Sequence, residues 1–106
     1  MQIVEDVRGD AKIEHMPVSF IDTLAVVYRV AKRLDDAQAV LEEATVNWSN
    51  QPKLVFQLGM VYADQNKSGE ARRTLERALQ LGLSGNYAEE AKRQLQTLVE
   101  NAEESS

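Results

Sequence analysis

The sequence contains no cysteine and a single histidine, so it lacks much of the chemistry that an active site uses. Without cysteine the chain forms no disulfide and holds no thiolate nucleophile or cysteine-bound metal. His15 stands outside any metal-ligand or nucleophile pattern, and we expect a solvated or turn residue there. Phosphate-binding glycine loops are absent as well. We therefore expect no enzyme activity, no metal and no cofactor.

Basic residues and long apolar runs are also scarce. The chain has 12 Lys and Arg against 17 Asp and Glu, and its net charge of −5 disfavours a nucleic-acid or anionic-membrane partner. No apolar run approaches the roughly 20 residues that cross a bilayer, so we expect no membrane insertion. Acids stand at the N-terminus, where a signal peptide would be basic. The compartment stays open: cytoplasmic for a complete chain, periplasmic or exported for a C-terminal fragment.

An internal repeat is the main feature that the sequence does contain. When the sequence is shifted along itself so that Leu24 falls on Leu58, several positions carry residues of matching type in one frame without a gap. We call this shift, from residue 24 to residue 58, the repeat period. The small residues suit places where two helices approach closely, and the larger ones fill the space beside them. The aligned pairs are Leu24 and Leu58, Ala25 and Gly59, Tyr28 and Tyr62, Ala37 and Ala71, Leu41 and Leu75, and Ala44 and Ala78.

This pattern resembles the tetratricopeptide repeat, which has the same period and the form W-x2-L-G-x2-Y followed by A-x3-F. The second copy carries Leu58-Gly59-x2-Tyr62 and Ala71-x3-Leu75. Aliphatic residues replace the tryptophan and the phenylalanine, namely Ile21, Val55, Leu41 and Leu75. The resemblance covers about residues 18–98, and it implies an all-α, right-handed α-solenoid of helix hairpins that binds other proteins.

The repeat register divides the chain into five parts. Two repeats are followed by a capping helix, whose apolar stripe would pack on the array while its other side stays in water. That stripe consists of Ala88, Ala91, Leu95 and Leu98. The parts are an N-terminal segment at 1–17, repeats at 18–51 and 52–85, the capping helix at 86–101 and a frayed tail at 102–106.

Local signals predict the boundaries of the four repeat helices. The first covers about 19–32, and Asp35 or its neighbour caps the second, which ends near Asn47. Pro52 suits the first turn of the third helix. Ser68 is a good N-cap for the fourth.

Glycine and asparagine mark the passage to the last helix. Gly82 is expected to end the fourth helix in the left-handed conformation, with Leu83 folding back on it. Asn86 followed by Glu89 predicts a capping box for the fifth helix.

Residues 1–17 are open to three interpretations. Ile3, Val7 and Ala11 lie on one side of a possible helix that would cover the first repeat, although Gly9-Asp10 interrupts it. The alternatives are a disordered arm and a segment that packs on a second molecule.

Four short segments carry a second, narrower resemblance. They are Asp22-Thr23-Leu24-Ala25, Leu58-Gly59-Met60-Val61-Tyr62, Glu70-Ala71-Arg72 and Ala88-Glu89-Glu90-Ala91. Together they are similar to the last repeats of bacterial exopolysaccharide-associated tetratricopeptide lipoproteins. Those proteins are exported and longer, so the resemblance implies that this chain is a C-terminal fragment.

The tetratricopeptide resemblance also indicates where a partner would bind, because the first helix of each hairpin lines a concave groove in that family. The core positions of these helices are Ile21, Leu24, Tyr28, Leu58 and Tyr62. The candidate binding residues are the ones left over: Asp22, Val26, Arg29, Val30, Lys53, Phe56, Met60, Ala63 and Asp64.

Two i, i+4 pairs make this predicted groove apolar. Val26 with Val30, and Phe56 with Met60, each form a compact patch on one side of a helix. A methionine beside an aromatic ring suits an apolar side chain of a partner. Core packing is the alternative for these pairs, since the first helix is apolar nearly all round.

Chaperone-binding members of the family carry a lysine and an asparagine that clamp a terminal carboxylate. The matching places here hold Asp22 and Val26, or Phe56 and Met60, so the resemblance implies no such clamp. Two basic residues, Arg29 and Lys53, would serve as modest charge handles.

Trp48 and two acidic pairs have alternative interpretations. Trp48 either covers the turn against the next helix or lies exposed in an interface. Asp35-Asp36 and Glu42-Glu43 are expected as caps or solvated helix faces rather than as catalytic acids.

The sequence thus predicts a non-catalytic scaffold that holds a peptide or helix of another protein in the groove. One alternative is a homo-oligomer that pairs through the first helix or residues 1–17. Two repeats fall below the roughly three that a stable array needs, and this favours such pairing. The other alternative is the terminal part of a larger scaffold.

Overall fold

The computed structural model describes residues 17–105, with side chains from 17 to 100. The predictions for His15 and for Ile3, Val7 and Ala11 lie outside these residues. The described part is all-helical and holds no strand, which confirms the all-α class. No described helix is both long and apolar enough to cross a membrane. The helices are α2 (Val18–Val30), α3 (Leu34–Asn47), α4 (Pro52–Asp64), α5 (Ser68–Gln80) and α6 (Gly85–Ser105).

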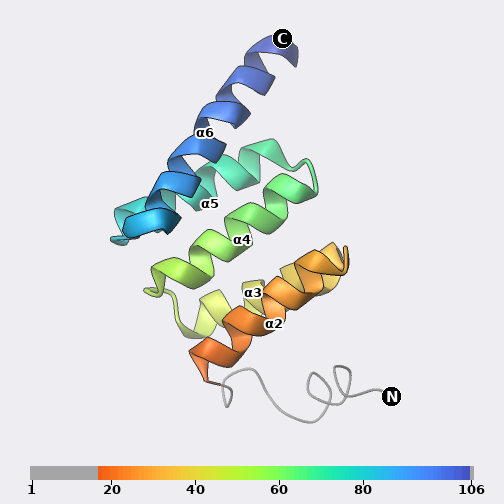
Figure 1. Ribbon diagram of the computed structural model, residues 1–106, viewed down its shortest axis with the longest axis vertical. Helices are drawn as coiled ribbons and strands as arrows, with labels where there is room; N and C mark the ends of the chain where they lie inside the picture. Colours follow the sequence, from red (N-terminus) through yellow and green to blue (C-terminus); the bar gives the residue numbers. More distant parts are fainter. Residues whose placement is uncertain (1–16, 106) are drawn as a thin grey trace.

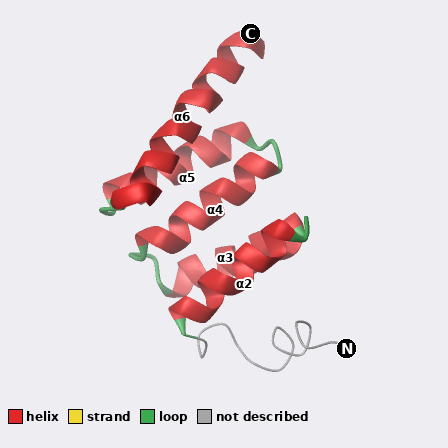
Figure 2. Ribbon diagram, in the orientation of Figure 1, coloured by secondary structure: helices red, strands yellow, loops and turns green. Residues whose placement is uncertain are grey.

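Successive helices fold back on one another across short loops (Figure 2). In Figure 1, α2, α4 and α6 follow one another up the molecule, and α3 lies behind α2. Contacts join α2 to α4 and α4 to α6. The other two helices pack against this row: α3 contacts α2 and α4, and α5 contacts α4 and α6.

The core lies between these helices and is centred on α4. Every aligned pair of the internal repeat is buried. The five predicted core residues, Ile21, Leu24, Tyr28, Leu58 and Tyr62, are all confirmed. In α4 the whole run from Leu54 to Tyr62 is buried because helices pack on several of its sides. Trp48 is half-buried against this core.

Gly59 confirms that small residues mark a close approach of helices. A Cβ atom added there would lie 2.7 Å from both Cγ and Cδ2 of Leu75 in α5. That distance is shorter than van der Waals contact allows, so α4 and α5 meet at a spacing that excludes even alanine unless Leu75 moves.

The turn after α2 and the turn after α4 have the same backbone conformation. Lys32 and Asn66, which stand one repeat period apart, both adopt the left-handed conformation, with φ of 63° and 64°. The next residues, Arg33 and Lys67, have nearly equal dihedral angles. Because Lys32 leaves the helical conformation, α2 ends at Val30 rather than near residue 32.

These turns also correct the predicted N-caps. Helices α3 and α5 begin at Leu34 and Ser68, and their N-cap positions are held by Arg33 and Lys67 without a side-chain hydrogen bond. Ser68 and Asp35 are therefore inside the helices, and the predictions that they cap were wrong. The backbone turn starts each helix instead. The prediction for Pro52 is confirmed, since it opens α4.

The passage from α5 to α6 is partly as predicted. Gly82 takes a φ of +102°, and the N–H of Leu83 donates to the carbonyl of Ala78 at 3.1 Å, which confirms the left-handed helix end. The capping box is wrong, because α6 begins at Gly85 and Asn86 lies inside it. The helix continues through Ser105, beyond the expected end at 101. Of its predicted stripe, three residues are buried and Leu95 is half-buried.

Candidate protein-binding face

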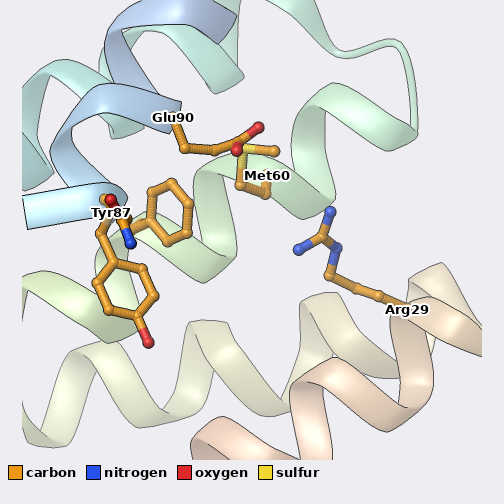
Figure 3. A pocket seen from close by; sticks show the side chains of 6 residues that line it. Arg29, Met60, Tyr87 and Glu90 are labelled. Carbon is orange, nitrogen blue, oxygen red and sulfur yellow. The ribbon is translucent and has the colours of Figure 1, made fainter.

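On the face formed by α2, α4 and α6, the described residues line three hollows. The central hollow, of about 320 Å³, is lined by Arg29, Phe56, Met60, Asn86, Tyr87 and Glu90 (Figure 3). The entry hollow, of about 350 Å³, lies where α2 and α4 begin and includes Asp22, Pro52 and Lys53. The outer hollow, of about 340 Å³, lies where these two helices end and is lined by Val26, Arg29, Val30, Lys32 and Asp64.

One wall of the central hollow is apolar, and two helices supply it. Phe56 and Met60 are i, i+4 neighbours of α4, and they are 5% and 8% exposed. Tyr87 of α6 places its ring edge-on to Phe56, with centroids 5.6 Å apart and planes at 72°. Tyr87 itself is 38% exposed. The Phe56–Met60 pair therefore belongs to the core and also lines a hollow, so the two interpretations of this pair overlap.

The two predicted charge handles, Arg29 of the central hollow and Lys53 of the entry hollow, are already engaged within the face. Arg29 donates from Nε to Oδ2 of Asp64 at 3.0 Å and from Nη1 to Oε1 of Gln57 at 3.3 Å. Gln57 is buried, so this bond satisfies a polar group inside α4. Lys53 holds its Nζ 5.2 Å from the ring centroid of Tyr87. Both predicted charge handles thus have intramolecular partners, and a charged group of a ligand would have to compete with those partners.

Arg29 joins the central and outer hollows, because it lines both. Its guanidinium reaches from α2 toward the central hollow in Figure 3. The two hydrogen bonds to α4 hold the side chain in this bridging position. A ligand that spans both hollows would pass over this group.

Most of the predicted residues meet at these hollows. All of them except Ala63, which is half-buried against the core, line one of the three. Val26 and Val30 are 41% and 77% exposed, so the alternative that they are simply core residues is wrong for the described chain.

Three residues of α6 were missed by the sequence prediction. Asn86, Tyr87 and Glu90 line the central hollow, yet their helix was interpreted only as a cap. A signal existed in the register, because Tyr87 and Glu90 fall one repeat period after Lys53 and Phe56. Extending the groove positions by one more period gives Tyr87 and Glu90 but not Asn86, because Pro52, one period before it, was not a predicted binding residue.

The two acidic pairs singled out in the sequence, Asp35-Asp36 and Glu42-Glu43, both lie on α3. Within the described residues, no three histidine, aspartate or glutamate side chains gather as metal ligands. Asp36 pairs with Arg33 at 2.7 Å. Glu42 was expected on a solvated face, but it is half-buried, and its carboxylate accepts hydrogen bonds from Tyr62 Oη at 2.5 Å and Gln38 Nε2 at 2.9 Å. It joins the two hairpins and lies away from the hollows.

Comparison with known proteins adds no family. No protein-family model matches the chain, and no curated protein or solved structure matches it at a significant level.

Proposed function

We propose that this chain is a non-catalytic protein-binding module of the tetratricopeptide type. In this proposal its hairpins form a short right-handed α-solenoid, and a peptide or helix of another protein lies across α2, α4 and α6. The repeat register in the sequence and the matching turns at Lys32 and Asn66 support the repeat.

The central hollow is the observation that carries the proposal. Its volume falls at the lower end of the range typical of ligand pockets. Phe56, Met60 and Tyr87 provide an apolar wall, and such aromatic pockets dominate the energy of many protein interfaces. Half-exposed Tyr87 forms the rim that an entering side chain would cover.

The expected ligand is an apolar side chain on a peptide of mixed polarity. Arg29 and Lys53 already have partners, so an acidic residue of the ligand would compete with Asp64 or with the Tyr87 ring. Affinity should therefore depend more on the buried apolar contact than on charge, and it should change little with salt.

Tyr87→Ala tests this proposal with little risk to the fold, since the ring is only partly buried. Peptides selected on the wild-type chain from a displayed random library serve as probes. We expect Tyr87→Ala to weaken their binding by about tenfold or more, as truncation of an interface anchor does.

Val46→Ala is the matched control, because Val46 is 81% exposed on α3 and lines none of the three hollows. It should leave the affinity unchanged. Selected peptides that bind Tyr87→Ala as tightly as the wild type, while circular dichroism shows both folded, would refute the proposed site.

A further inference from the structure

A second surface of the molecule, separate from the three hollows, is apolar and uncovered by the described residues. On α2, Phe20 and Val27 are 42% and 51% exposed. They stand close to two turns of helix apart, so they share one face. Neither lines one of the hollows described above.

The positions of α4 that correspond to this face in the repeat register are buried. The positions one repeat period later are Leu54 and Val61 of α4, and both are 0% exposed. In α4 they belong to the core, where the preceding hairpin of α2 and α3 packs on the helix. Helix α2 therefore exposes apolar residues at positions that are fully buried in α4, a helix that packs on the hairpin before it.

We propose that residues 1–16 of the same chain cover this face of α2, as α3 packs against α4. Ile3 and Val7 fall one repeat period before Ala37 and Leu41, which are both 0% exposed in α3. The length also fits, because residues 1–17 take the register positions of α3 and of the loop that follows it.

The entry of the chain into α2 supports the same path. Pro17 and Gln51 are the N-cap residues of α2 and α4, and both have extended backbone. The carbonyl of Pro17 accepts from the N–H groups of Phe20 and Ile21 at 3.0 and 3.2 Å. The carbonyl of Gln51 accepts from Leu54 and Val55 at 3.1 and 3.2 Å. The chain thus enters both helices with similar geometry.

The register also locates the contact. Hydrogen bonds from Tyr62 to Glu42 and from Lys67 to Gln38 place residues 38–42 alongside the end of α4. By the same spacing, residues 4–8 would lie alongside the end of α2, beside Val27. Asp6 and Asp10 stand where Val40 and Ala44 are buried, so the contact we propose rests on Ile3 and Val7 alone.

Thiol labelling tests this contact, and the natural absence of cysteine makes it selective. Val27→Cys and the control Val46→Cys each introduce one thiol on an exposed valine of a helix. In the full chain we expect Val27→Cys to react about tenfold more slowly with a small disulfide reagent than Val46→Cys. Adding Val7→Asp should restore the Val27→Cys rate and leave the Val46→Cys rate unchanged, because burial of a charge disrupts apolar packing.

Two outcomes would overturn the proposal. Equal labelling of the two thiols, unaffected by Val7→Asp, would mean that Val27 is open to water. Protection that grows with protein concentration over an about hundredfold range would assign the face to a second copy of the chain. Neither outcome bears on the groove, since peptide binding through Tyr87 is measured separately.

Discussion

Tyr62 links the two hairpins through its hydroxyl group. Its Oη donates to Glu42 at 2.5 Å, and Glu42 also accepts from Gln38. Lys67 completes the network by donating to Gln38 at 3.0 Å and by placing its Nζ 5.9 Å from the Tyr62 ring centroid. A hydrogen bond to a charged partner contributes about 1.5–3 kcal/mol, so this contact stabilises the junction of α3 with α4.

The Tyr62 network predicts a loss of stability in alkali. Burial raises the pKa of Tyr62 far above its ordinary value, and the hydrogen bond and negative charge of Glu42 raise it further. A tyrosine whose pKa is higher in the folded chain adds stability that is fully present below about pH 10. Above that pH the unfolded chain loses the proton first. The free energy of unfolding, measured with urea, should therefore fall more steeply for the wild type than for Tyr62→Phe.

The reference for this test is the difference in free energy of unfolding between the wild type and Tyr62→Phe at neutral pH. At that pH the variant should be less stable than the wild type by about 1–3 kcal/mol, because Glu42 loses a donor. The other tyrosines are present in both proteins and cancel. A difference that stays constant as the pH rises about one unit above the ordinary tyrosine pKa would contradict this account.

At the scale of elements, the contact of α4 with α5 depends on the absence of a side chain at Gly59. Leu75 is 0% exposed, and its Cγ and Cδ2 would lie 2.7 Å from an added Cβ. Alanine gains about 1 kcal/mol of helix propensity over glycine, but overpacking costs about 1–3 kcal/mol. We expect Gly59→Ala to lower the free energy of unfolding by about 1 kcal/mol.

Gly69→Ala is the matched control for this substitution. It lies in the first turn of α5, and the nearest atom to its added Cβ is Arg73 Nη1 at 3.6 Å. Chemical denaturation should show no loss of stability for it. Equal stability of Gly59→Ala and Gly69→Ala would mean that the two helices separate at little cost.

The helices and their order were predictable because each depends on many residues at once. Apolar spacing and the repeat register place the helices, and a local error changes little. Their first residues were less predictable, since a single polar side chain was taken as the signal. Ser68 and Asp35 are good capping residues, yet the backbone turns at Asn66 and Lys32 begin these helices without them.

The candidate site was predictable in α2 and α4 and missed in α6. Phe56 and Lys53 follow from helical spacing within the two repeats. Tyr87 packs on both of them, but it belongs to a helix whose sequence departs from the repeat motif. Contacts of this kind depend on how neighbouring hairpins stack, and spacing within one helix contains no information about that.

At the scale of the whole molecule, the two ends of the helix stack differ. Helix α6 turns exposed polar residues such as Glu89, Lys92 and Gln96 outward. Helix α2 instead exposes Phe20 and Val27. Repeat arrays require a polar outer face at each end, and this difference gives residues 1–16 a structural role in our account.

The position of a bound peptide tests the central claim most directly. Methionine-methyl NMR reports on the central hollow, because Met60 lies in its wall, and loss of one signal in Met60→Leu assigns the resonance. The account predicts that peptides selected on the wild-type chain shift the Met60 methyl signal in proportion to their occupancy, since the aromatic rings of Phe56 and Tyr87 line the same hollow. Saturating peptide that leaves the Met60 signal unchanged would contradict binding at this face.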